Sequence, residues 1–192
     1  MKEIKKVTIP TCLTLLRLIG APFLVPFLIV NYLPQNNCVI NSWIAALFLF
    51  FGFTDFLDGY VARRYAQTSD LGAILDHLAD KCLIFSTLIA LLAIHKIYYV
   101  WVLLLIGREF FIMGLREIAL KYAMSIPVSS FGKLKTCIHI VLMTWIILNP
   151  SQAVISLVWN SIELILLCIS LFLSWYSAFH YFFIFYAQLK DR

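Results

Sequence analysis

Six apolar stretches follow one another along the chain, and each is long enough to cross a lipid bilayer as a helix. They cover residues 12–33, 40–60, 72–94, 97–119, 133–149 and 157–187. The hydrocarbon core of a bilayer is about 30 Å thick, and roughly 17 to 25 apolar residues cross it in an α-helix. The pattern therefore predicts an all-α, polytopic integral membrane protein with six transmembrane helices. The last stretch exceeds one crossing, which leaves open a tilted or bent final helix or an interfacial segment after Pro150.

The composition agrees with a membrane protein. Hydrophobic residues make up 62% of the 192 residues and charged residues only 13%. The mean hydropathy is +0.92, and these values together exceed those of an ordinary soluble domain. No internal repeat or linker divides the chain, and the loops hold too few residues for a second folded unit. We therefore expect residues 1–192 to form a single membrane-embedded domain.

Basic residues are distributed unequally between the two sides of the predicted bundle. Lys and Arg are enriched in the cytoplasmic loops of membrane proteins. One side collects most of them, whereas the other side, formed by 31–42, 95–99 and 149–152, has only Lys96. We predict that both termini and the basic side face the cytoplasm. The net charge of +5 then reflects topology, and since no basic stripe with interleaved aromatic residues exists, nucleic acid is not expected as a partner.

An acidic motif interrupts the second and third apolar stretches. It reads Asp-x-x-Asp-Gly-x-x-Ala-Arg, eight residues, then Gly-x-x-x-Asp-x-x-x-Asp. Its fixed residues are Asp55, Asp58, Gly59, Ala62, Arg63, Gly72, Asp76 and Asp80. Residues three or four apart share a helix face, so the spacing predicts one stripe on each of two successive helices. Two such stripes facing each other would form a box of four carboxylates.

Four carboxylates within membrane helices need positive partners. Each costs at least about 2.5 to 3.5 kcal/mol to insert, and like charges this close repel each other. Salt bridges to Arg63, Arg64 and Lys81 are one explanation, but they would not require small residues on the same helix faces. Oxygen ligands without His or Cys favour Mg²⁺ or Mn²⁺. Two such ions are a known arrangement for phosphoryl transfer, so the motif predicts a metal-dependent enzyme.

The small residues of the motif predict a nucleotide. Gly59, Ala62 and Gly72 would let a base and a ribose approach the helix backbone, and Arg63 offers a planar donor for phosphate oxygens. We therefore expect metal-assisted transfer on a phosphorylated, nucleotide-bearing substrate at the cytoplasmic membrane surface. A divalent-cation transporter would instead place its acids near the middle of the bilayer. A scaffolding role would tolerate Asp80→Asn.

The motif resembles the signature of the CDP-alcohol phosphatidyltransferases at every fixed position, and the six-helix plan is that family's plan too. Eight fixed residues across 26 positions make the resemblance specific. Four further segments resemble the bacterial phosphatidylglycerophosphate synthases in particular. They are Ile9-Pro10-x-x-Leu13-Thr14-x-x-Arg17, Arg108-Glu109, Leu115-Arg116-Glu117 and Gly132-Lys133-x-Lys135-Thr136. Two positions depart from the usual pattern, with Thr11 in place of Asn and His77 in place of Pro.

The resemblance implies a reaction in which CDP-diacylglycerol and sn-glycerol 3-phosphate give phosphatidylglycerol phosphate and CMP. Asp55, Asp58 and Asp76 would hold the metal ions, and Asp80 would share a metal ion and act as general base on the acceptor hydroxyl. The residues implied to contact the nucleotide are Gly59, Ala62, Arg63, Gly72, Thr14 and Arg17. A homodimer in the bacterial cytoplasmic membrane is also implied.

Four basic residues form the predicted site for the phosphate of the acceptor. They are Arg108, Arg116, Lys133 and Lys135. A dianionic phosphate needs several cations without acidic competitors, and these four are expected near the same side of the membrane. The set favours glycerol 3-phosphate over serine. Inositol phosphate would satisfy the same charges, and phosphatidylglycerol, used by cardiolipin synthases of this fold, also carries a phosphate, so these acceptors stay open.

Overall fold

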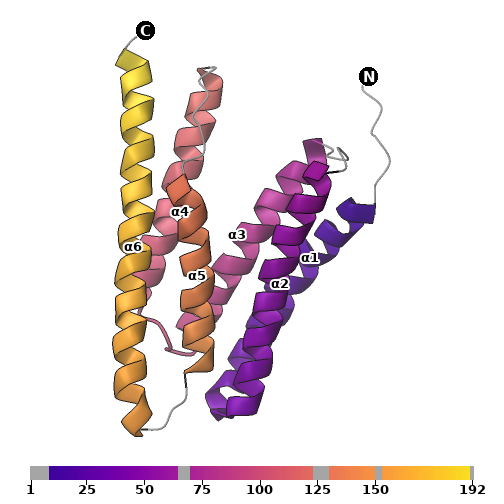
Figure 1. Ribbon diagram of the computed structural model, residues 1–192, viewed down its shortest axis with the longest axis vertical. Coiled ribbons are helices and arrows are strands. Elements are labelled where there is room, and N and C mark those ends of the chain that lie inside the picture. Colours follow the sequence, from indigo (N-terminus) through magenta and orange to yellow (C-terminus); the bar gives the residue numbers. More distant parts are fainter. Residues whose placement is uncertain (1–8, 65–69, 123–129, 150–152, 191–192) are drawn as a thin grey trace. The chain divides into compact units, whose positions relative to one another are not determined.

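The computed structural model describes residues 9–64, 70–122, 130–149 and 153–190, and these residues are almost entirely helical. Their α-helices are α1 Ile9–Tyr32, α2 Cys38–Arg64, α3 Asp70–Ala93, α4 Tyr99–Lys121, α5 Ser130–Leu148 and α6 Ala153–Lys190 (Figure 1). A short 3-10 helix, η1, spans Leu33–Gln35 between α1 and α2. Side chains are described for 20–53, 81–119, 121–122, 134–149 and 158–190.

The helices coincide with the six apolar stretches of the sequence, which confirms the all-α prediction. They contain 19 to 38 residues, and at a rise of 1.5 Å per residue they reach about 28 to 57 Å. Among the described residues, Val158–Lys190 within α6 is the one helix that is long and apolar enough by itself to cross a membrane. Shorter apolar helical runs are Cys38–Phe53, Lys81–Ala93 and Leu134–Leu148.

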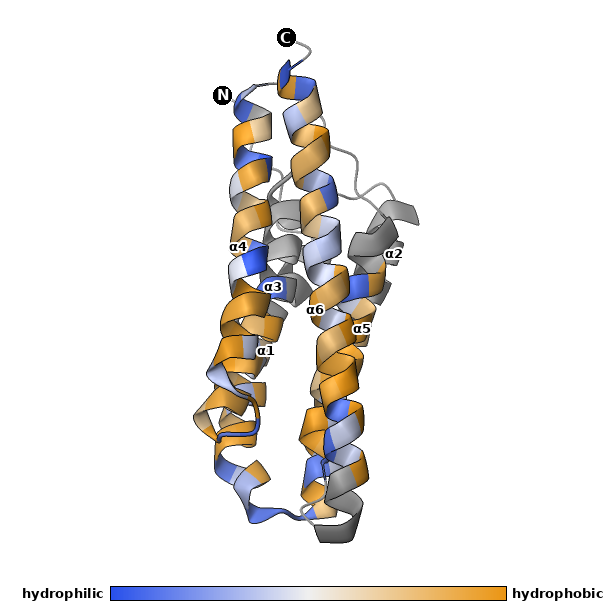
Figure 2. Cartoon of the chain, turned by 90° about the vertical axis from the view of Figure 1, so that its left-hand side faces the viewer, coloured by the Kyte–Doolittle hydropathy of each residue, from blue (hydrophilic) through white to orange (hydrophobic). Residues whose placement is uncertain are grey.

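Large apolar side chains cover outward-facing parts of the helices. On α6 an aromatic stripe repeats every three or four residues and is 47 to 69% exposed; it consists of Phe172, Tyr176, Phe179, Phe183 and Tyr186. Figure 2 shows the hydrophobic colour along most of the described helical ribbon. Soluble monomers rarely expose large contiguous apolar patches, whereas hydrocarbon accepts them without penalty. The surface therefore suits a membrane-associated protein.

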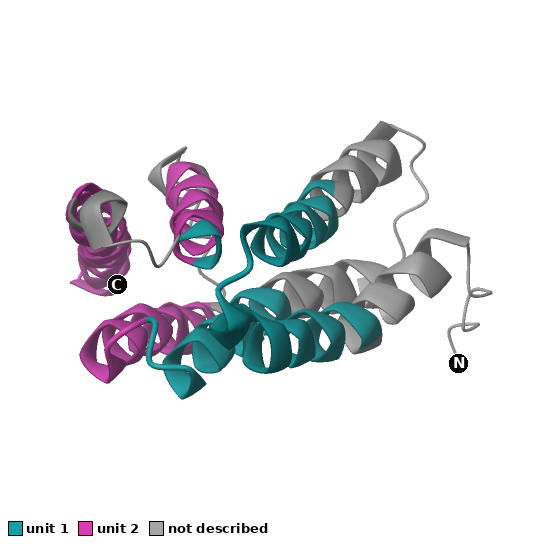
Figure 3. Cartoon of the chain, turned by 90° about the horizontal axis from the view of Figure 1, so that it is seen from below, with its two compact units in different colours: residues 1–96, 147–151 teal, residues 97–146, 152–192 magenta. Residues whose placement is uncertain are grey.

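The chain separates into two compact units (Figure 3). Unit 1 comprises residues 1–96 and 147–151, and unit 2 comprises 97–146 and 152–192. In unit 1, α1 packs along α3 and also contacts α2. In unit 2, α4 packs on α6. The buried side chains of that α4–α6 contact are Ile112, Leu115, Ala119, Ala178, Tyr181 and Phe185.

Left-handed residues terminate two helical segments. Asn36 has φ 53° and follows η1, and His95 has φ 57° and follows α3. The His95 N–H donates to the Leu92 carbonyl oxygen and the Lys96 N–H to the Leu91 carbonyl oxygen, each at 3.0 Å. This pair of bonds is the Schellman motif, which satisfies the last carbonyl groups of a helix. The motif therefore closes the C-terminal end of α3.

Candidate active site

The acidic motif lies on α2 and α3, where the two helices join the same short connection (Figure 1). Asp55 and Asp58 belong to the last three turns of α2, and Asp76 and Asp80 to the first three turns of α3. Only residues 65–69 separate the two helices. A connection this short keeps two helix ends near each other, so the backbone brings both halves of the motif to one end of unit 1. The side chains of the motif lie outside the described residues, and the carboxylate box stays a prediction.

The predicted nucleotide-binding residues belong to neighbouring helices of the same unit. Gly59, Ala62 and Arg63 are on α2, Gly72 is on α3, and Thr14 and Arg17 are on α1. Because α1 packs along α3 and contacts α2, all the helices that carry predicted metal and nucleotide residues touch one another. The side chains of these residues, and those of Thr11 and His77, lie outside the described residues.

The donor set of the motif fits a hard divalent cation. Four carboxylates on adjoining helix ends supply oxygen atoms alone, and Mg²⁺ and Mn²⁺ prefer oxygen ligands. Carboxylates brought to one end of a helix pair also need positive charge between them. The residues present therefore suit such ions.

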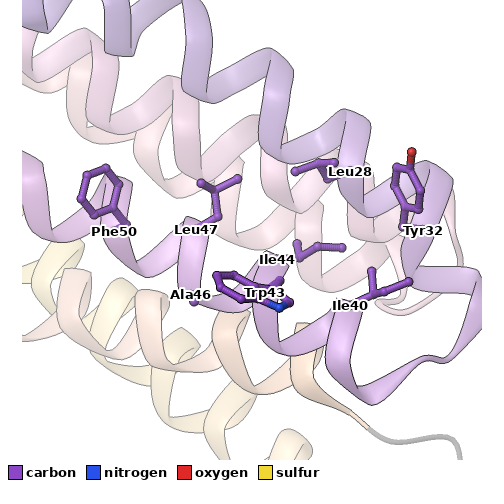
Figure 4. Close-up of a pocket in the computed structure, with 8 residues that line it drawn as sticks. All are labelled: Leu28, Tyr32, Ile40, Trp43, Ile44, Ala46, Leu47 and Phe50. Atoms are coloured by element: carbon purple, nitrogen blue, oxygen red, sulfur yellow. The ribbon is translucent and has the colours of Figure 1, made fainter.

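An apolar groove of about 610 Å³ lies between α1 and α2 in unit 1 (Figure 4). Its lining consists of Leu28, Tyr32, Ile40, Trp43, Ile44, Ala46, Leu47 and Phe50. None of these side chains carries a charge, so the groove offers no ligand to a metal ion and no cation to a phosphate. The lining on α2 precedes the acidic motif along the helix. The groove and the motif are therefore separate features of unit 1.

Arg108 is the centre of a buried polar network in unit 2. This residue of α4 is 3% exposed. Its Nε donates to the Ser174 carbonyl oxygen at 2.8 Å, its Nη1 to Glu109 Oε1 at 2.8 Å, and its Nη2 to Ser177 Oγ. Serine side chains are small, and they let the guanidinium approach the backbone of α6. Arg108 thus links α4 to α6 and to the carboxylate beside it.

Glu109 joins two of the predicted acceptor-binding residues. Its Oε1 accepts from Arg108 Nη1 and from Lys135 Nζ, so one carboxylate oxygen contacts a cation from α4 and a cation from α5. Lys135 is 8% exposed. The expectation that these cations have no acidic neighbour is wrong, because Glu109 lies between them. The sequence shows Glu109 directly after Arg108. It does not show that Glu109 contacts Lys135, because these two residues are 26 positions apart.

Arg116, the third predicted acceptor-binding residue with a described side chain, contacts α6 through one aromatic ring. Its Nη2 donates to the hydroxyl oxygen of Tyr181 at 3.2 Å, and its guanidinium carbon lies 5.5 Å from the centroid of that ring. This distance permits a cation–π interaction.

On α5, the Nδ1 atom of the buried His139 lies 2.9 Å from the Lys135 carbonyl oxygen. The side chain of Lys133 lies outside the described residues.

Comparison with known proteins places the chain in a family. A sequence model of the family described as CDP-alcohol phosphatidyltransferase matches residues 7–180. The chain belongs to the CDP-alcohol phosphatidyltransferase family. The matched region includes the acidic motif, the predicted nucleotide-binding residues and the predicted acceptor-binding residues. The resemblance found from the motif is thereby confirmed, and the chain is a phosphatidyltransferase.

Curated relatives of this phosphatidyltransferase are similar over most of their length. A protein of Wigglesworthia glossinidia brevipalpis named CDP-diacylglycerol--glycerol-3-phosphate 3-phosphatidyltransferase is 34% identical over 194 residues, covering 96% of this chain and 98% of the relative. A protein of the same name from Rickettsia typhi (strain ATCC VR-144 / Wilmington) is 32% identical, covering 91% and 94%. A third, from Salmonella choleraesuis (strain SC-B67), is 39% identical, covering 74% and 78%.

Proposed function

We propose that this protein transfers the phosphatidyl group of CDP-diacylglycerol to sn-glycerol 3-phosphate, giving phosphatidylglycerol phosphate and CMP. The observation that carries the proposal is the complete acidic motif at the adjoining ends of α2 and α3. Relatives named for this reaction, at 32 to 39% identity, support the choice of acceptor within the family.

The four aspartates Asp55, Asp58, Asp76 and Asp80 are proposed to hold two divalent ions, Mg²⁺ or Mn²⁺. When bound, such ions would neutralise the diphosphate and the charge that develops on the leaving group. The support for this assignment is the all-oxygen donor set and the position of its four residues at the adjoining ends of α2 and α3.

Asp80 is proposed as the general base. Its carboxylate accepts the proton of the acceptor hydroxyl while the glycerol oxygen forms a bond to the phosphorus that carries the diacylglycerol. The bond from this phosphorus to the bridging oxygen breaks, and CMP leaves with the electron pair. Arg63 donates hydrogen bonds to the phosphate oxygens of the departing CMP. No covalent intermediate with the protein is required.

Two sets of residues are proposed to bind the two substrates. The residues proposed to line the nucleotide site in unit 1 are Gly59, Ala62, Arg63, Gly72, Thr14 and Arg17. The residues proposed to bind the phosphate of glycerol 3-phosphate in unit 2 are Arg108, Arg116, Lys133 and Lys135. The polar network around Arg108 and Lys135 supports the second assignment, because it keeps two cations inside a helical unit that is otherwise rich in apolar side chains.

We propose that the six helices cross a bacterial cytoplasmic membrane with both termini and the active site on the cytoplasmic side. The helix lengths, the exposed aromatic stripe of α6 and the one-sided distribution of Lys and Arg support this topology. Residues 1–192 are proposed to act as one domain, which is supported by a family match that runs across both compact units. A homodimer is the assembly that the family resemblance implies.

The test is CMP release by detergent-purified protein supplied with CDP-diacylglycerol and Mg²⁺. Glycerol 3-phosphate, inositol phosphate, serine and phosphatidylglycerol are compared as acceptors. We expect release with glycerol 3-phosphate alone, and loss of at least about a hundredfold in rate for Asp80→Asn because a general base is removed. Asp70→Asn, on the same helix but outside the motif, is the matched control and should retain activity. Release with a different acceptor would show that glycerol 3-phosphate is not the acceptor. Full activity of Asp80→Asn would show that Asp80 is not the general base.

A further inference from the structure

The position of Glu109 suggests a role in arranging the acceptor site, and that role rests on the proposed function. Arg108 and Lys135 come from different helices of unit 2, and both are buried, at 3% and 8% exposure. Two like charges in a poorly solvated interior repel each other more strongly than they would in water. The two cations therefore stay close together only if an anion contacts both of them. Glu109 is that anion, since its Oε1 accepts from both side chains.

The two cations are held by different means. Arg108 has additional acceptors on α6, the carbonyl oxygen of Ser174 and Oγ of Ser177, so its guanidinium is oriented from two sides. The ammonium of Lys135 is placed relative to Arg108 through the shared carboxylate oxygen of Glu109. Without that carboxylate, the flexible lysine side chain would move away from the guanidinium.

We propose that Glu109 is a positioning residue that holds Lys135 beside Arg108, so that both cations are ready for the phosphate of the acceptor. A carboxylate and a phosphate are both anions, so Glu109 acts through the cations and has no contact with the substrate in this arrangement. One carboxylate between two cations leaves the trio positive, as a phosphate site requires.

The test compares Glu109→Gln with wild-type protein in steady-state kinetics for both substrates. Glutamine keeps the size of the side chain and removes its charge. We expect the KM for glycerol 3-phosphate to rise at least about tenfold, while the KM for CDP-diacylglycerol changes less than about twofold. Glu109→Asp keeps the carboxylate and should restore part of the loss. A purely structural link between α4 and α5 would affect both KM values alike or neither.

Glu117→Gln is the matched control. Glu117 follows Arg116 on α4 as Glu109 follows Arg108, but its side chain is exposed, so both KM values should stay at the wild-type level. An unchanged KM for glycerol 3-phosphate in folded Glu109→Gln, or an equal rise for both substrates, would overturn the role of Glu109.

Two further outcomes remain decisive. If Glu109→Gln does not fold, as judged by gel filtration, Glu109→Asp decides: a selective rise in the KM for glycerol 3-phosphate supports the role, and an unchanged value overturns it. If wild-type protein uses inositol phosphate instead of glycerol 3-phosphate, the proposed acceptor is wrong. The same comparison made with inositol phosphate then decides the role of Glu109 separately.

Discussion

Ser177→Ala measures how much the buried contact of Arg108 stabilises the packing of α4 against α6. Ser177 is 0% exposed, and its Oγ accepts a hydrogen bond from Arg108 Nη2. Alanine removes that single oxygen and otherwise keeps the shape of the side chain. The charged N–H then loses its acceptor in a position that solvent does not reach.

The expected loss follows from the energy of one hydrogen bond to a charged group. Such bonds contribute about 1.5 to 3 kcal/mol to stability, so the free energy of unfolding should fall by this amount. In a chain of 150 to 250 residues, 1 kcal/mol corresponds to roughly 2 to 4 °C in melting temperature. We therefore expect Ser177→Ala to melt about 3 to 12 °C below wild type.

Ser170→Ala is the matched control on the same helix. Ser170 is also 0% exposed, but its Oγ has no hydrogen-bond partner among the described residues. Removing an unpaired buried hydroxyl should be neutral or slightly stabilising. Thermal unfolding in detergent, followed by tryptophan fluorescence, compares the two variants. Equal melting temperatures would refute the stabilising role of the contact between Ser177 and Arg108.

Three other results follow from the site and the fold. Chelation of divalent ions by EDTA should abolish CMP release, and Mg²⁺ or Mn²⁺ should restore it; activity that persists in excess EDTA would contradict the metal proposal. His95→Gly should raise the free energy of unfolding by up to about 1 kcal/mol in thermal melts, because glycine adopts the positive φ of 57° without steric cost; a lower melting temperature would argue against this. Tyr181→Phe removes the acceptor of Arg116 but keeps the ring. This hydrogen bond is 3.2 Å long and only part-buried, so its loss should lower the free energy of unfolding by about 0.5 to 1.5 kcal/mol, less than the loss of the buried contact of Arg108. Tyr181→Leu should cost more in the same melts, and equal losses would show that the ring adds no stability.

Much of the helical architecture was predictable from short segments of sequence. The apolar stretch 12–33 became α1, Ile9–Tyr32, and 97–119 became α4, Tyr99–Lys121. The last stretch was predicted to start at residue 157, whereas α6 begins at Ala153 and continues for 38 residues. Helix formation depends on residues close together in the chain, so hydrophobic length indicates where helices lie. The ends of the helices depend on turns, and the observed ends differ by a few residues from the predicted ends.

The acidic motif was recognisable for the same local reason. Its residues lie within 26 positions on two consecutive helices, so helical spacing alone indicates which of them share a face. The motif resembles the signature of the family, and the family match over residues 7–180 confirms that resemblance. The sequence indicates the four predicted acceptor-binding cations only by their charge and their expected side of the membrane. Neither property shows which acidic groups lie among them.

Long-range packing established the surroundings of those cations. The partners of Arg108 on α6 are 66 and 69 residues away, and Glu109 meets Lys135 across 26 residues. No local periodicity encodes such contacts, because they depend on which helix faces pack together and on the small serines that let a guanidinium approach α6. The sequence was sufficient for the helices, the motif and the family, whereas the placement of a carboxylate between two buried cations required the packed arrangement of α4, α5 and α6.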